Sequence, residues 1–204
     1  MSLDTMHSEI DGLRGQAAEL ADDYARTQYE ISSDPNLTDA GKKDALAPLN
    51  EDLRTKVAAL RQRETEVVQK TREALERQLY GTSGSSADIT SFRGAQDIAA
   101  RITDSDEAHE RYITALRSDD KILARAIFQR ATTQGWDKVL KDHVTRNPSV
   151  KPLLDDLNTI RRYEQNTLAA TMHYTTPGLS TQRPVSAPII SSGEMKAFFF
   201  GRGR

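Results

Sequence analysis

Four histidines are the side chains best suited to bind a metal ion or move a proton in this chain of 204 residues: His7, His109, His143 and His173. A zinc-binding helix needs a second histidine one turn after the first, and the pair His109-Glu110 has none at that distance. The chain has no cysteine, so thiolate ligands and disulfides are excluded. We interpret the histidines as solvated or half-buried side chains and expect no metal or cofactor.

Adjacent carboxylates are the next candidates for chemistry, and they occur at Asp22-Asp23, Glu51-Asp52, Asp119-Asp120 and Asp155-Asp156. Neighbours on a helix point about 100° apart, so such pairs do not converge on one substrate. The stretch "DSDE" at 104–107 lacks the glycine and the distal glutamate of a calcium-binding loop, and we expect it to cap a helix. We find no nucleophile motif either, and we expect a protein that is not an enzyme.

The segment "GEMKAFFFGRGR", residues 193–204, carries the strongest functional signal. Phe198, Phe199 and Phe200 could fill an apolar pocket or add a strand to a sheet edge of a partner. Arg202 and Arg204 could then reach an acidic or phosphate-rich surface. Exposed phenylalanines favour aggregation unless they dock, so we predict that these five residues bind a partner. The alternative is an incidental disordered end.

The first 31 residues show the apolar spacing of a coiled-coil helix, with alternating steps of three and four. Gly12 and Gly15 weaken this helix by roughly 1 kcal/mol each. The residues of the stripe are Leu3, Met6, Ile10, Leu13, Ala17, Leu20, Tyr24, Thr27 and Ile31.

A turn at "SSDPN", residues 32–36, separates this helix from a second one. Thr38 is its expected N-cap, and Pro48 should kink it or begin its main section. An eleven-residue repeat, which gives 3.67 residues per turn, predicts a nearly straight stripe to Leu79. Its rows are Leu46, Val57, Val68 and Leu79; Leu49, Leu60 and Thr71; and Leu53, Glu64 and Leu75.

The two helices predict a coiled-coil-like antiparallel hairpin over residues 1–80, projecting as an arm. The Gly/Ser-rich stretch 81–88 is the expected linker, residues 89–173 the expected small helical bundle, and residues 174–204 an extended tail. We expect bundle helices at about 90–102, from the cap at 103–107, and at about 119–133, 136–146 and 150–172. Gly135 should end the third of these, Trp136 should anchor the core, and Arg161 and Arg162 should form exposed ion pairs. The sequence therefore predicts an all-α fold. The residues expected to pack the two long helices are Leu3, Met6, Ile10, Leu13, Leu20, Leu46, Leu53, Val57, Leu60, Val68 and Leu79.

The overall net charge of −2 is unevenly distributed. Residues 1–80 hold 11 Lys and Arg against 16 Asp and Glu (net −5), residues 81–173 hold 13 of each, and residues 174–204 hold 4 against 1 (net +3). This distribution argues against nucleic-acid binding by the folded part. The sequence has no apolar signal region at residues 1–12 and no apolar run of membrane-spanning length, so we expect neither a signal peptide nor a membrane location.

The hairpin, the small helical body and the long tail, together with the stretch "DPNLTDAGKKDAL" at 34–46, resemble structural proteins of tailed bacteriophages. Two groups are similar in layout: head–tail connector (adaptor) proteins, which form rings on the portal, and acidic scaffolding proteins, whose basic C-terminal segment binds capsid subunits. The resemblance implies a non-enzymatic homo-oligomeric subunit with self, portal or capsid protein as partners. The expected location is the virion, or the host cytoplasm during assembly. A nucleic-acid-associated regulator, contacting phosphate through the basic tail, is the third alternative.

Overall fold

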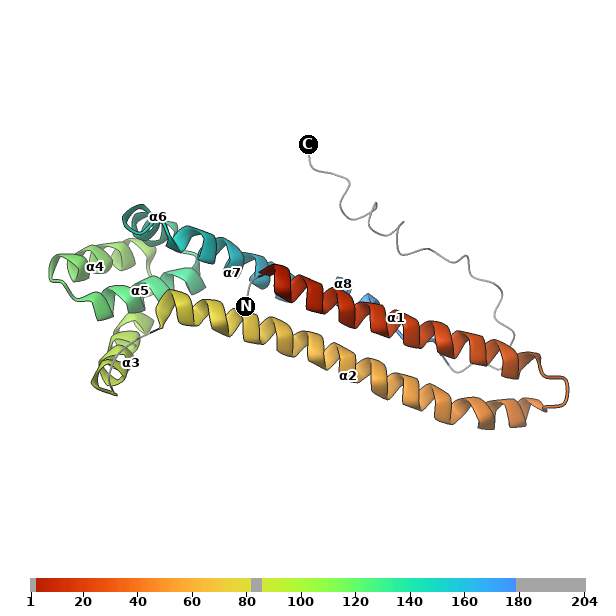
Figure 1. Ribbon diagram of the computed structural model, residues 1–204. Helices are drawn as coiled ribbons and strands as arrows, with labels where there is room; N and C mark the ends of the chain where they lie inside the picture. Colours follow the sequence, from red (N-terminus) through yellow and green to blue (C-terminus); the bar gives the residue numbers. More distant parts are fainter. Residues whose placement is uncertain (1–2, 82–85, 179–204) are drawn as a thin grey trace. The chain divides into compact units, whose positions relative to one another are not determined.

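The computed structural model describes residues 3–81 and 86–178, and within these ranges it consists of eight α-helices and no strand (Figure 1). The predicted all-α class is confirmed. The helices are α1 (Leu3–Ser33), α2 (Asp39–Tyr80), α3 (Ser86–Ala100), α4 (Ser105–Arg117), α5 (Lys121–Gln134), α6 (Asp137–Arg146), α7 (Val150–Gln165) and α8 (Thr167–Met172).

The described residues fall into two compact units whose boundaries lie inside α1 and α2. The first unit comprises residues 1–13 and 62–172, and the second comprises residues 14–61 and 173–204. The predictions of a projecting arm over 1–80 and of a separate bundle over 89–173 stay predictions. The predicted linker at 81–88 lies partly outside the described residues.

The turn between α1 and α2 is built by two side-chain caps. The Asp34 carboxylate accepts a hydrogen bond from the Asn36 amide at 2.8 Å, which closes an Asx turn. The Thr38 hydroxyl accepts one from the Gly41 amide at 3.2 Å, so Thr38 is the N-cap that the sequence predicts. Pro48 lies inside α2, which begins at Asp39 rather than at the proline.

Within the second unit, α1 and α2 run antiparallel. Ala17 and Tyr24 of α1 share a buried cluster with Leu53 and Val57 of α2. Nearer the turn, the Lys42 ammonium donates a hydrogen bond to the carbonyl of Ser32 at 2.8 Å. Residues nearer the end of α1 therefore contact residues nearer the start of α2, which is the arrangement of an antiparallel hairpin.

The first unit has a core centred on α5, which contacts α3, α4 and α6. Small side chains allow this close approach, since the buried faces carry Ala95 and Ala99 of α3 and Ala126 of α5. Phe128 of α5 fills the centre and is 1% exposed. Burying such a side chain contributes roughly 1.5–3 kcal/mol. Trp136 is also buried in this cluster, as predicted.

Helix ends in this unit follow the sequence signals. Asp104 caps α4 by accepting from the amides of Asp106 and Glu107, so "DSDE" is a cap as predicted. Gly135 ends α5 with a φ of 72°, a left-handed conformation that glycine adopts without strain.

The end of α5 is also capped from α7. Arg161 donates a hydrogen bond to the Thr132 carbonyl in the last turn of α5, where helix carbonyls lack partners within the helix. The prediction of an exposed ion pair for Arg161 is therefore wrong, because an unpaired helix carbonyl lies within its reach. Arg162 has the Thr159 hydroxyl as its partner at 3.4 Å instead of a carboxylate.

Helix α7 packs on the parts of α1 and α2 that belong to the same unit. Ile160 is fully buried with Met6, Ile10, Val67, Val68 and Leu75. The predicted helix over 150–172 is interrupted at Asn166, which separates α7 from α8. This packing gives the first unit a second apolar cluster beside the α5 core.

Candidate docking surface

The predicted packing residues of α1 and α2 are all buried or partly buried, and Leu79 packs in the α5-centred core, which contains no residue of α1. Those buried are Met6, Ile10, Leu13, Leu46, Leu53, Val57 and Val68, and those partly buried are Leu3, Leu20, Leu60 and Leu79. Leu49 differs from its place in the eleven-residue repeat, since it is 39% exposed and Asn50 is buried beside it at 4%.

The stripe of α1 also shifts by one position as the turn approaches. Gln28 and Ser32 are buried, whereas the heptad pattern places Thr27 and Ile31 there. A straight helix of 3.6 residues per turn drifts about 20° per heptad from a 3.5-residue repeat, and four heptads accumulate about one position. Near the turn the α1–α2 seam is therefore partly polar.

The first described residues of the tail are held on this hairpin. Tyr174 is 8% exposed and packs in the cluster of Ala17, Tyr24 and Val57. The Asn50 side-chain amide donates a hydrogen bond to the Pro177 carbonyl at 3.0 Å. Residues 174–177 are therefore held against the hairpin, with Pro177 beside Asn50.

The sequence analysis did not predict the roles of Tyr174 and Asn50, the two side chains that hold the start of the tail. Asn50 lies four residues after Leu46 and three before Leu53, so a buried register was readable, but an asparagine on an apolar face gives no indication of its partner. The predicted partner-binding residues Phe198, Phe199, Phe200, Arg202 and Arg204 lie outside the described residues.

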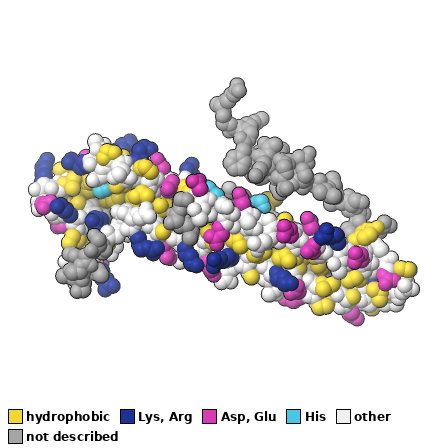
Figure 2. All heavy atoms as spheres, in the orientation of Figure 1, with side chains coloured by type: hydrophobic (Ala, Val, Ile, Leu, Met, Phe, Trp, Pro, Cys, Tyr) yellow, Lys and Arg dark blue, Asp and Glu magenta, His cyan; other side chains and the backbone are white. Residues whose placement is uncertain are grey.

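The part of the hairpin nearest the turn combines apolar exposure with acidic charge. We define the hairpin end as residues 19–52, all within the second unit. Tyr29, Leu37 and Leu49 are 43%, 37% and 39% exposed, and Figure 2 shows hydrophobic side chains gathered over this part of α1 and α2. The segment also holds nine Asp and Glu against three Lys and Arg, net −6. Such a surface suits an apolar, basic partner.

The titratable side chains of the first unit have structural partners. The Tyr112 hydroxyl lies 2.7 Å from Nδ1 of His143, and the Phe128 ring stacks on that imidazole with 3.7 Å between centroids. Burial lowers the pKa of His143, with the nearby Asp142 carboxylate acting in the opposite direction. Burial and Asp142 together raise the pKa of Tyr112 to about 12. Both groups are therefore held neutral.

His109, the histidine of the His109-Glu110 pair, lies near the Asp142 carboxylate. Its Nε2 lies 3.8 Å from Oδ2 of Asp142, while Oδ1 of Asp142 lies 3.2 Å from Nε of Arg146. Among the residues that the structure describes, no group of three His, Asp or Glu side chains could hold a metal ion.

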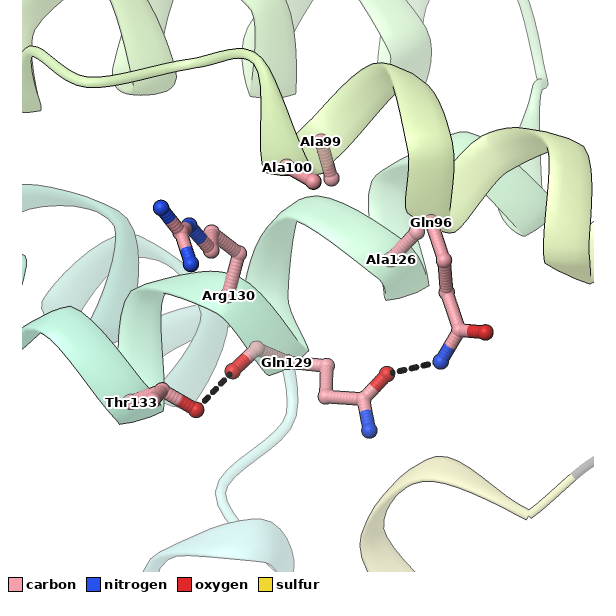
Figure 3. Close-up of a pocket in the computed structure, with 7 residues that line it drawn as sticks. All are labelled: Gln96, Ala99, Ala100, Ala126, Gln129, Arg130 and Thr133. Atoms are coloured by element: carbon pink, nitrogen blue, oxygen red, sulfur yellow. Dashed lines mark hydrogen bonds between the residues drawn. The ribbon is translucent and has the colours of Figure 1, made fainter.

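A shallow hollow of about 170 Å³ lies between α3 and α5 (Figure 3). Alanines line one side, and the amides of Gln96 and Gln129 bond each other at 2.8 Å across the other. Arg130 also lines it, with its guanidinium carbon 6.0 Å from the centre of the Trp136 ring. The polar lining thus serves the packing of α3 on α5.

No described helix combines the length and apolar character needed to cross a membrane. The chain matches no family model, no curated protein and no solved structure.

Proposed function

We propose that this chain is a non-enzymatic structural subunit that assembles with neighbouring subunits through its C-terminal tail. The observation that carries the proposal is the anchoring of the first residues of the tail, by buried Tyr174 and by the bond from Asn50 to Pro177. A segment that is already anchored at its base leaves fewer residues to be ordered when its far end binds a partner.

The composition of the tail supports docking of that far end. Residues 179–204 carry three consecutive phenylalanines and four Lys and Arg against one Glu. The phenylalanines supply apolar area, and the arginines supply charge-assisted hydrogen bonds to a partner. About 20 residues separate Gly178 from Phe198, which is a reach of at most about 72 Å.

A head–tail connector of a tailed phage is the particular role that we propose, on the layout of hairpin, helical body and anchored tail. Such a subunit forms a ring with copies of itself and grips a portal protein by extended termini. The acidic hairpin and basic tail also fit a scaffolding protein, which is the second candidate.

The proposal is tested by measuring the mass of the assembly by light scattering for the natural chain and for the variant Phe198→Ser, Phe199→Ser and Phe200→Ser. We expect the natural chain to form a defined oligomer and the variant to remain monomeric with unchanged helicity by circular dichroism. A ring favours the connector, and dimers or tetramers favour the scaffolding protein. A natural chain that is monomeric alone and with portal or capsid subunits would contradict both.

The matched control replaces Arg202 and Arg204 by alanine while keeping the phenylalanines. We expect weaker assembly, because only the charged part of the contact is removed. DNA binding that is strong, falls with salt and disappears in this control would support the nucleic-acid-associated regulator instead.

A further inference from the structure

The hairpin end has the complementary features that the tail requires. Its exposed apolar side chains Tyr29, Leu37 and Leu49 match the phenylalanines, and its net charge of −6 matches the net +3 of residues 179–204. Apolar anchors surrounded by opposite charges are the usual composition of a specific protein interface.

The acidic side chains of the hairpin end are available for such a contact. Glu30, Asp39, Asp44 and Glu51 are all exposed. Asp23 is instead paired with Arg26 one turn away. The negative charge therefore lies on both helices, beside the exposed leucines.

We propose that the hairpin end of one copy is the docking site for residues 194–204 of a second copy. The proposal rests on the proposed function, and it deepens it by naming the receptor surface and by making the partner another copy of this chain. Each subunit then presents one tail and one receptor, a head-to-tail arrangement that closes into a ring when the rotation between copies allows it.

The position of Pro177 on the hairpin end favours docking on a second copy over docking on the same copy. Pro177 of the tail accepts a hydrogen bond from Asn50, which lies inside the hairpin end. Docking on the same surface would require the chain to reverse its direction within about 20 residues. Pro184 and Pro188 lie in this stretch and bias the backbone toward extended conformations, which oppose such a reversal.

The natural absence of cysteine allows a direct test. Copies carrying Leu37→Cys are mixed with copies carrying Gly201→Cys, and a short bis-maleimide links thiols that lie close together. We expect a covalent dimer joining position 37 of one copy to position 201 of the other, identified by peptide mass. The matched control mixes Gly201→Cys with Glu73→Cys, an exposed position on α2 in the first unit. Its yield of heterodimer should be about tenfold lower, because proximity sets the effective concentration.

A second experiment tests the same contact without a cross-linker, by complementation between two variants. One copy carries serine at Phe198, Phe199 and Phe200, and the other carries Leu37→Ser and Leu49→Ser. We expect each variant to be monomeric alone and the two to form a dimer when mixed, since one intact tail meets one intact receptor.

Three results would overturn the receptor assignment. Equal linking at positions 37 and 73 would show a contact without specificity. Variants that remain monomeric when mixed would show that tail and hairpin end do not meet between copies. Normal assembly of the Leu37→Ser, Leu49→Ser variant, while the phenylalanine variant fails, would refute the receptor and leave the proposed function standing. The proposed function itself fails only if the phenylalanine variant assembles normally or the natural chain does not assemble.

Discussion

His143 is a residue whose protonation is controlled by its packing in the first unit. Its ring is stacked on Phe128 and its Nδ1 meets the Tyr112 hydroxyl, so burial lowers its pKa below the ordinary value near 6.5. When the folded pKa is lower than the unfolded pKa, the unfolded chain binds more protons in the window between them. Stability is therefore fully present above about pH 6.5 and is lost as pH falls through that window.

We predict that unfolding free energy, measured by urea titration, decreases between about pH 7.5 and about pH 5 more steeply for the natural chain than for His143→Gln. The substitution also removes packing contacts, but that loss is the same at every pH and does not change the slope of the unfolding free energy against pH. His7→Gln serves as the control because His7 is exposed, and it should retain the natural slope. Parallel slopes for the natural chain and His143→Gln would contradict the assignment.

Glu64 illustrates how far single residues can be read from the sequence. The eleven-residue repeat places this carboxylate in an apolar row of α2, and the structure buries it at 4% exposure. Its partner is the hydroxyl of Tyr163, which donates from α7. A buried charge requires such a partner. The burial of Glu64 was therefore readable from local spacing, but the partner lies 99 residues away and required the tertiary fold.

At the scale of elements, replacing a glycine by alanine should have opposite effects on stability at a helix end and in a helix interior. Gly135 ends α5 with φ of 72°, where a side chain is strained. Gly12 lies inside α1 with no atom within 4 Å of an added Cβ. We predict that Gly135→Ala lowers the unfolding free energy by about 1 kcal/mol and that Gly12→Ala raises it by about 0.5–1 kcal/mol.

Urea unfolding followed by circular dichroism measures both glycine variants under one condition. Gly15→Ala provides a second interior position on α1 and should match Gly12→Ala, because an added Cβ there also meets no atom within 4 Å. Destabilisation by Gly12→Ala and Gly15→Ala would contradict the prediction, because a helix-interior glycine with open space around it should gain from an added methyl group.

The sequence predicted helices better than it predicted the surfaces that they bury. Capping by Thr38 and Asp104 and the stop at Gly135 depend on neighbours in the sequence, and all three were correct. The burial of Gln28 and Ser32 and the exposure of Leu49 were not predicted. These depend on how a straight helix drifts from an ideal repeat and on the packing of Tyr174 against the hairpin.

The whole molecule separates its charges along the chain, with net −6 on residues 19–52 and net +3 on residues 179–204. If these two segments meet in the assembly, part of its free energy is electrostatic attraction between exposed groups. Raising salt from about 0.1 M to about 1 M shortens the Debye length from about 10 Å to about 3 Å and screens that part. Apolar contacts of the phenylalanines are not screened.

We therefore predict that the midpoint concentration for assembly, followed by light scattering, rises with salt without assembly being abolished. The dependence of this midpoint on salt concentration should be weaker for the double variant Arg202→Ala, Arg204→Ala, which has two fewer charges to screen. It should be unchanged for Lys138→Ala. Lys138 is a matched cation whose ion pair with Asp106 lies within the first unit, outside the hairpin end. Assembly that strengthens with salt in the natural chain would assign the contact to apolar burial alone. In that case the acidic charge of the hairpin end would have another purpose, and the leucines Leu37 and Leu49 would remain to be tested as the sole receptor.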